Sequence, residues 1–318
     1  MTVVVFDHTP HDGTPFLLQF LAGTNLAAFF FISGYLKKPS ISYRESLKKY
    51  FHCLIIPYFI YNVVFYPYWL GKFYIQNGSI TIIDAIKPII GTILGQLDSI
   101  FSTELNGVTW FLLSLFVMHV ITDYCNKHKH REILMLGISI VAMILYGANK
   151  YYHFAPYLTF HGLVRCIPFF FLGNLMRQSI WLKEVKLERE LTISIIALTV
   201  SLLLFYWHIN ENTFILHIAL YFIVNLISIF AVICLWRCIN NFRSHIVVWI
   251  SIGTMMIFGF HRIIVGVICY CMEEAFHLHN IIYTCPKAAT IALATEFLLL
   301  PSIYFTYKYC PILLGKKK

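Results

Sequence analysis

Residues 16–50 read FLLQFLAGTNLAAFFFISGYL followed by KKPSISYRESLKKY, an apolar stretch that ends abruptly in a strongly basic one. Residues 16–36 carry no charged side chain and are long enough to cross a hydrocarbon core of about 30 Å as a helix. Residues 37–50 hold five Lys and Arg. A membrane-spanning helix followed by a basic loop is the unit from which we predict the fold.

The whole chain shares this apolar character. Its residues are 59% hydrophobic and 12% charged, with a mean hydropathy of +0.72, whereas soluble domains are roughly 45–50% apolar and 25% charged. Nine mostly apolar segments are about 17–25 residues long: 16–36, 51–70, 108–124, 132–148, 161–177, 191–208, 214–236, 246–270 and 288–307. Strand-like alternation is weak, which favours helices over a β-barrel. We predict an all-α integral membrane protein, with one domain over residues 1–318 and about ten transmembrane helices, the first incomplete.

Basic residues gather on one side of this bundle. If the spans alternate in direction, eighteen of the twenty-four Lys and Arg fall on one side and four on the other. The first side comprises 37–50, 126–131, 177–190, 237–245 and the tail after 307; the second comprises 71–107, 149–160, 209–213 and 271–287. Basic loops stay in the cytoplasm, so we expect the first side and the C-terminus there. The net charge of +9 then reports topology, and no nucleic-acid partner is expected.

The stretch MTVVVFDH, residues 1–8, precedes the first full span. By the alternation of the loops it runs towards the outer face, but at 1.5 Å per residue it covers only about 12 Å. We expect either a truncated first helix or an N-terminus that begins within the membrane. The outer loop 71–107 contains ITIIDAIKPIIGTILG, which is typical of a short amphipathic or re-entrant helix.

The nine cysteines form no CxxC pair and most simply pack within apolar helices; a disulfide or a metal is the alternative. No His and Cys spacing typical of a zinc site is complete. We therefore expect no bound metal.

Five motifs follow one another along the chain: AAFFFISGYLKK (27–38), LKKYFHCLIIPY (47–58), NGVTWFLLSLF (106–116), IPFFFLGNLMR (167–177) and ISIGTMMIFGFH (250–261). In this order, on about ten spans, they resemble the membrane-bound acyltransferase 3 family, particularly its sugar O-acetyltransferase branch, similar to fucose 4-O-acetylase. Each motif alone is ordinary aromatic-rich membrane sequence. The resemblance runs from about residue 3 to 307.

The resemblance implies ten helices that move an acyl group, often acetyl, from a cytoplasmic coenzyme A thioester to a hydroxyl of a sugar or lipid-linked glycan. In the family's first helix, a basic residue is followed about three turns later by a catalytic His. VVVFDH matches the His end and places His8 at that position, while the basic residue has no counterpart here. The aromatic residues before Ser33 also lack the Met-Pro pair of many relatives.

His8 would act as the general base that removes the proton of the attacking hydroxyl. An imidazole titrates near neutral pH, which suits this role. Ionisable groups at membrane depth cost about 2.5–3.5 kcal/mol, so their presence indicates function. The alternative is a histidine at the lipid interface.

His161 and Arg165 are four residues apart and so share a helical face. Arg165 could hold a pantetheine carbonyl, a coenzyme A phosphate or the developing oxyanion, or it could pair with a carbonyl to stabilise the bundle. His261 and Arg262 pose the same choice. His261 is favoured because a motif of the family ends on it.

Three further residues are possible substrate contacts. Lys48 and Lys49 lie where the family has basic residues, on the side where coenzyme A phosphates arrive, but anchoring by the positive-inside rule explains them equally well. Trp110 could stack on a sugar or anchor its helix at the membrane interface. Ser33 is not expected to be a nucleophile, because FISGY lacks the Gly-x-Ser-x-Gly turn.

We therefore expect a multi-pass protein of a bacterial cell membrane that moves acetyl from acetyl-CoA to a hydroxyl of capsule, O-antigen or exopolysaccharide, or of a lipid-linked precursor. Its expected partners are acyl-CoA, the glycan acceptor and the bilayer, without a permanently bound cofactor. A rival is a non-enzymatic transporter or flippase of a lipid-linked sugar, which the lack of two related halves disfavours. A third hypothesis is a truncated, inactive acyltransferase.

Overall fold

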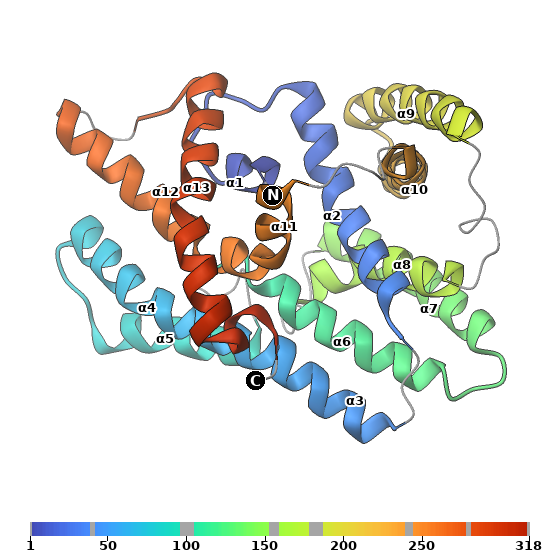
Figure 1. Cartoon of the computed structure of the whole chain (residues 1–318), viewed down its shortest axis with the longest axis horizontal. Helices are drawn as coiled ribbons and strands as arrows, with labels where there is room; N and C mark the ends of the chain where they lie inside the picture. Colours follow the sequence, from blue (N-terminus) through green and yellow to red (C-terminus); the bar gives the residue numbers. More distant parts are fainter. Residues whose placement is uncertain are drawn as a thin grey trace.

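The computed structural model describes residues 2–38, 42–95, 105–152, 159–177, 187–238, 244–277 and 281–316. Within these residues the chain folds into helices joined by connections, and no β-strand is present (Figure 1). The helices are α1 (Thr2–Asp7), α2 (Phe16–Leu36), α3 (Tyr43–Tyr50), α4 (Ile56–Asn77), α5 (Ile82–Leu94), α6 (Trp110–Cys125), α7 (Arg131–Tyr152), α8 (Phe160–Met176), α9 (Leu187–Asn210), α10 (Phe214–Cys238), α11 (His245–Ile252), α12 (Thr254–Phe276) and α13 (Cys285–Tyr309). A π-helix, η1 (Phe51–Ile55), links α3 to α4, and a 3₁₀-helix, η4 (Pro311–Leu314), follows α13.

The expectation of an all-α polytopic membrane protein is confirmed. Among the described residues, seven helical segments are long and apolar enough to span a membrane: Phe16–Leu36, Tyr43–Asn77, Arg131–Tyr152, Glu188–Asn210, Phe214–Cys238, Thr254–Phe276 and Cys285–Tyr309. The shorter helices α6 and α8 are apolar as well. Together these elements account for all nine apolar segments of the sequence.

The basic stretch after the first span is more ordered than the expected loop. Tyr43–Tyr50 forms α3, which continues through η1 into α4 as one long helical segment. Glu45 lies in the first turn of α3, and Lys48 and Lys49 lie in its last turn. Glu45 complements the positive N-terminal end of the helix dipole, whereas the two lysines lie inside the continuous helical segment, just before η1.

The expected span 246–270 is also not continuous. It divides at Gly253 into α11 and α12. A Cβ atom on Gly253 would overlap the side chain of Ile303 in α13. The break therefore lies where α13 makes its closest approach, and glycine is the residue that permits the contact.

The amphipathic stretch of loop 71–107 forms a helix, as expected, namely α5. Thr81 caps it, with its hydroxyl accepting from the backbone N–H of Asp84 and the Asp84 carboxylate accepting from the backbone N–H of Thr81. The hydroxyls of Tyr58 and Tyr66 in α4 donate to carbonyls of α5. The paired capping stabilises the start of α5, and the two tyrosine hydrogen bonds hold α5 along α4.

Helices α2 and α8 cross in direct backbone contact. A Cβ atom on Gly34 would overlap the backbone of Phe170, and one on Gly173 would overlap the backbone of Phe31. The side-chain amide of Asn174 also donates to the carbonyl of Gly34 across the crossing, at 3.2 Å. Small residues at such a crossing let two membrane helices approach and gain van der Waals contact.

Substitution of Gly173 by Ala is expected to destabilise the protein, by about 1–3 kcal/mol, because the added methyl group must force α2 and α8 apart. Gly137→Ala in α7 is the matched control, since a Cβ atom there meets nothing within 4 Å. Thermal unfolding of the purified variants measures both effects. An unchanged unfolding temperature for Gly173→Ala would contradict the close crossing.

Buried apolar side chains form two clusters. The larger joins α2, α4, α6, α7, α8 and α10, and the smaller joins α1, α12, α13 and η4. In Figure 1, α2 stands between α1 and α13 on one side and the α9–α10 pair on the other. Helix α2 packs against α1 as well as against α8 and α10. It therefore contacts helices of both clusters.

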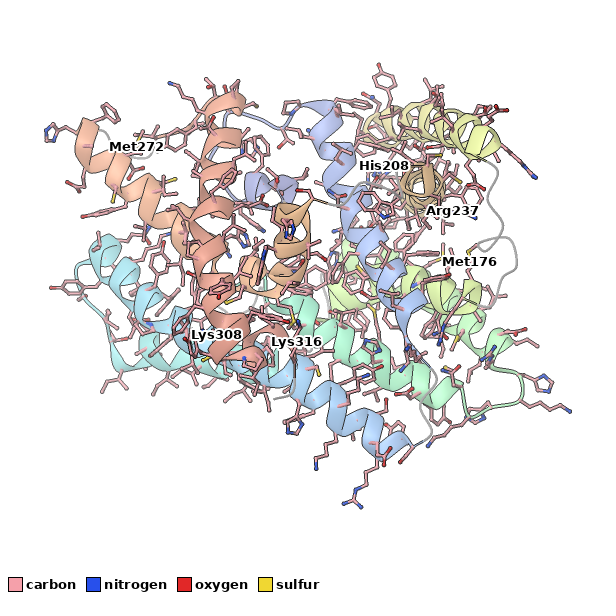
Figure 2. All side chains as sticks on the ribbon, in the orientation of Figure 1. Met176, His208, Arg237, Met272, Lys308 and Lys316 are labelled. Carbon is pink, nitrogen blue, oxygen red and sulfur yellow. The ribbon has the colours of Figure 1, made fainter. Side chains whose placement is uncertain are left out.

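The ends of α2, α6 and α8 meet the start of α3 at what we call the basic end. The ammonium of Lys37 lies 2.7 Å from Oδ1 of Asp123, whose Oδ2 accepts from the hydroxyl of Ser46. Arg177 Nη1 donates to the carbonyl of Lys37 at 2.7 Å. Helix η4 packs against η1, and Figure 2 shows Lys308 and Lys316 together at the lower end of α13. Parts of the other basic loops, 178–186 and 239–243, lie outside the described residues.

The opposite end joins the α1–α2 connection to the start of α13. His11 and Tyr283 form an isolated parallel bridge. The backbone N–H of Asp12 donates to the carbonyl of Tyr283 at 3.0 Å, and that of Tyr283 donates to Pro10 at 3.2 Å. These bonds hold the segment that follows His8 against the bundle.

Candidate functional site

His8 directly follows α1, and the packing of α1 sets its position. Val5 and Phe6 are buried in the smaller cluster with α12 and α13, and the backbone N–H of His8 donates to the carbonyl of Val5. The side chain of His8 is exposed. Its ring lies 5.1 Å from the ring of His261, between centroids, with 39° between the planes. The expected base and the histidine that ends the late motif therefore meet.

His261 is fully buried on α12 and has a defined tautomer. Its Nδ1 lies 2.8 Å from the carbonyl oxygen of Ile257 and 3.1 Å from that of Phe258. A carbonyl oxygen only accepts, so Nδ1 carries the proton and Nε2 keeps its lone pair. Among the described residues Nε2 has no hydrogen-bond partner. His261 thus keeps an unprotonated ring nitrogen, in a ring that neighbours the ring of His8.

The segment of α12 around His261 is fixed by two neighbours. Asn106 Nδ2 donates to the carbonyl of Gly259 at 3.0 Å, and a Cβ atom on Gly259 would overlap the ring of Tyr61. Arg262, which follows His261 in α12, acts electrostatically on His8. The site therefore combines two imidazoles with a cation, which is suited to proton removal from a hydroxyl and to stabilising negative charge on oxygen.

Arg165 lies in a separate cavity of about 280 Å³ lined by α2, α7, α8, α9 and α10, which we call the Arg165 pocket. Nε of Arg165 donates to the hydroxyl of Tyr221 at 2.6 Å, and the guanidinium carbon lies 4.9 Å from the Tyr221 ring centre. Among the described residues nothing joins Arg165 to His8, which belongs with the other cluster. The structure brings His8 to His261 and Arg262, and it brings Arg165 to a different set of residues.

Two histidines and a lysine line the Arg165 pocket. Nζ of Lys150 lies 2.8 Å from Nε2 of His217, whose Nδ1 lies 3.0 Å from the carbonyl oxygen of His208. Nδ1 of His217 therefore donates, and its Nε2 accepts from the ammonium of Lys150. The rings of His208 and His217 stack at 4.0 Å between centroids, and Figure 2 shows His208 where α9 and α10 meet α2.

The sequence alone did not assign a role to Lys150, His208 or His217. Lys150 counts there only as one of four lysines on the less basic side, and the two histidines flank the short 209–213 loop. The sequence indicates only that all three residues fall at helix ends on the same side of the bundle. It does not reveal which helices are neighbours.

His161 and Trp110 occupy other positions around α8. His161 is exposed, with Nδ1 3.2 Å from Nδ2 of Asn149 and its ring 5.3 Å from that of Tyr146, which also lines the Arg165 pocket. Trp110 begins α6, is half-buried and stacks on Phe30 at 6.1 Å between centroids. A Cβ atom on Gly162 would overlap the Trp110 ring, so the indole fills the space between α2 and α8.

Lys48 and Lys49 are exposed on α3 at the basic end. The ammonium of Lys49 lies 5.5 Å from the centre of the Tyr50 ring. Behind them Lys37 is buried: burial lowers the pKa of Lys37, while its hydrogen bond to Asp123 opposes that shift. The exposed lysines are therefore free to face an anionic ligand, whereas Lys37 is held by the protein.

The described residues contain no group of three or more His, Cys, Asp or Glu placed to hold a metal ion. Cys125, Cys166, Cys234 and Cys269 are buried thiols, as expected for cysteines that pack within apolar helices. The chain matches the model of a protein family described as an acyltransferase domain, the acyltransferase 3 model, over residues 1–305. No curated protein and no solved structure matches the chain.

Proposed function

The chain belongs to the acyltransferase 3 family, and from this premise we propose that it transfers an acyl group, in the first instance acetyl, from acyl-CoA to a hydroxyl of a cell-surface polysaccharide or its lipid-linked sugar precursor. Membership makes the protein a membrane acyltransferase. The observation that carries the finer proposal is the His8–His261 pair, with ring centres 5.1 Å apart.

In the proposed reaction His8 removes the proton of the acceptor hydroxyl as its oxygen attacks the thioester carbonyl carbon. A new C–O bond forms, and the carbonyl oxygen carries the negative charge of the tetrahedral intermediate. Arg262 offsets that charge. The C–S bond then breaks, and the protonated imidazole returns its proton to the leaving thiolate, so the products are the ester and coenzyme A.

His261 supports this cycle by its fixed tautomer. Because Nδ1 donates to carbonyls of its own helix, Nε2 can accept a proton or a hydrogen bond from the His8 ring. The fixed ring of His261 favours one orientation of the His8 ring. In other acid–base pairs, too, a further residue orients the base. The pair therefore acts as a base and its orienting partner.

We place the basic end in the cytoplasm of a bacterial cell membrane, with the C-terminus on the same side. Acyl-CoA then approaches past the exposed Lys48 and Lys49, whose charges suit the coenzyme's phosphates. His8 and the Arg165 pocket belong to the outer half of the bundle, where a surface glycan or its lipid-linked precursor is exposed.

Membranes containing the protein, incubated with radiolabelled acetyl-CoA and the polysaccharide fraction of the expressing cells, are expected to yield an alkali-labile labelled glycan. Membranes without the protein give the background. A protein that incorporates no label but accelerates movement of a lipid-linked sugar across the bilayer would instead support the transporter hypothesis.

A further inference from the structure

We propose that the Arg165 pocket binds an anionic group, a carboxylate or a phosphate, on the glycan acceptor, so that the acceptor is an acidic sugar. This inference rests on the proposed function, because it names the class of the acceptor. It is carried by the positive charge of the pocket, which forms no ion pair within the described residues, by buried polar atoms of two lining residues, and by its aromatic walls.

The pocket concentrates positive charge that no carboxylate of the described residues neutralises. Among the described residues neither Arg165 nor Lys150 forms an ion pair. The nearby carboxylate of Glu211 instead accepts from the backbone N–H of Thr213 and from Nε1 of Trp207. Charges inside a membrane protein are normally paired, so the guanidinium of Arg165 favours an anionic ligand in this pocket.

The guanidinium of Arg165 has donors to spare. Its Nε is used by Tyr221, and within the described residues the two terminal nitrogens have no acceptor. Two parallel N–H groups match the paired oxygens of a carboxylate or a phosphate. Tyr221 therefore acts as the support that holds the fork towards the cavity.

Buried polar atoms of two lining residues indicate that the ligand also carries hydroxyl groups. Oγ1 of Thr24 and Oδ1 of Asn225 are buried without a hydrogen-bond partner in the described structure, and the two residues are 2% and 4% exposed. The Thr24 hydroxyl can donate to an oxygen of the anion, whereas the Asn225 oxygen only accepts and needs a donor such as an O–H group. A sugar hydroxyl can donate to it, so a sugar that bears the anion accounts for both atoms.

The size and walls of the pocket fit one sugar unit. Phe20, Phe205 and Tyr146 contribute aromatic surface, which packs against the apolar face of a sugar ring. The volume of about 280 Å³ is close to the lower limit of roughly 300 Å³ for small-molecule sites. A whole coenzyme A is too large for this cavity.

The position of the pocket also favours the acceptor over the acyl donor. Arg165 lies early in α8, whereas Arg177, just after the helix, contacts Lys37 at the basic end. At 1.5 Å per residue the two arginines are about 18 Å apart along the helix. The pocket is thus remote from the lysines that suit coenzyme A. In Figure 1, the α9–α10 pair that lines it and α1, which His8 follows, lie on opposite sides of α2.

The test uses the purified full chain in nanodiscs of phosphatidylcholine and measures binding by calorimetry, without acyl-CoA. The probes are glucuronate, glucose 1-phosphate and glucose, which share one ring and differ in the anion. Glucuronate, glucose 1-phosphate or both are expected to bind at least about tenfold more tightly than glucose. Which of them binds tells whether the pocket selects carboxylate or phosphate.

Two variants connect this binding to the pocket. Arg165→Gln and Lys150→Gln are each expected to weaken binding of the anionic sugar about tenfold or more, and to leave glucose unaffected. Lys150 is exposed, so its variant remains informative if Arg165→Gln folds poorly. Lys72→Gln is the matched control, because Lys72 is an exposed lysine of α4 outside the pocket.

Equal binding of all three sugars, no binding of either anionic sugar, or undiminished binding by both pocket variants would overturn the proposal. So would loss of sugar binding when phosphatidylglycerol is added to the nanodiscs, because the pocket would then hold a lipid headgroup. A protein that binds the acidic sugar yet incorporates no labelled acetyl would contradict the proposed function and leave the pocket's assignment intact.

Discussion

Substitution of His8 by glutamine is expected to lower the turnover of acetyl transfer by about 100-fold to 10,000-fold, which is the usual contribution of a positioned acid–base group. Glutamine keeps a polar side chain of similar reach but cannot take up the hydroxyl proton. Because the proposed step changes only proton transfer, the KM for acyl-CoA is expected to stay within a few-fold of its original value. Initial rates with radiolabelled acetyl-CoA, at several concentrations, measure both quantities.

His11→Gln is the control for this substitution. His11 lies on the same connection, and both of its ring nitrogens are within hydrogen-bond distance of nearby threonines, Nδ1 at 2.6 Å from the Thr9 carbonyl and Nε2 at 2.8 Å from the Thr14 hydroxyl. It is therefore expected to affect stability more than turnover. Equal turnover of the His8 variant and the unmodified protein would rule out His8 as the base.

A double variant tests whether His261 acts through its contact with His8. If His261 acts only through His8, the variant with both His8→Gln and His261→Gln is expected to turn over no more slowly than His8→Gln alone. Once His8 is lost, removing a residue that acts through it costs no further activity. His261→Gln by itself is then expected to slow turnover by a smaller factor. Additive losses would mean that His261 contacts the substrate independently.

Much of the fold follows from local sequence, as the first span shows. Phe16–Leu36 lacks charge and is followed by lysines, so its length and its direction are both readable without any partner. The exceptions arise from contacts between distant segments. Gly253 interrupts an apolar run that is otherwise continuous. It lies against the side chain of Ile303, fifty residues later, and the local sequence does not predict that contact.

The candidate site also has residues that the sequence predicts and contacts that it does not. His8 and His261 are recognisable because each ends a motif, but their contact depends on how α1 packs against α12 and α13. The Arg165 pocket is less accessible to sequence reasoning, since Lys150, Arg165, His208 and His217 come from four different helices. A histidine such as His217 gains meaning only when Lys150 and His208 are known to be its neighbours.

The ion pair at the basic end is another such long-range contact, and it joins three helices. Lys37 follows α2 and Asp123 lies near the end of α6, while Ser46 of α3 donates to the same carboxylate. The side chains of Lys37 and Asp123 are 0% and 4% exposed. Water therefore cannot replace either partner when the other is removed.

Asp123→Ala is accordingly expected to lower the free energy of unfolding by about 3–5 kcal/mol, because it leaves the buried ammonium of Lys37 without its counter-charge. Replacing both partners, with Lys37→Met and Asp123→Leu together, is expected to recover most of that loss, since two apolar side chains of similar volume need no pairing. Lys38→Met is the control, because Lys38 is the exposed neighbour of Lys37. Denaturant unfolding of the purified variants measures the differences. Should the double variant be as unstable as Asp123→Ala alone, the loss would come from the missing Ser46 bond rather than from an uncompensated charge.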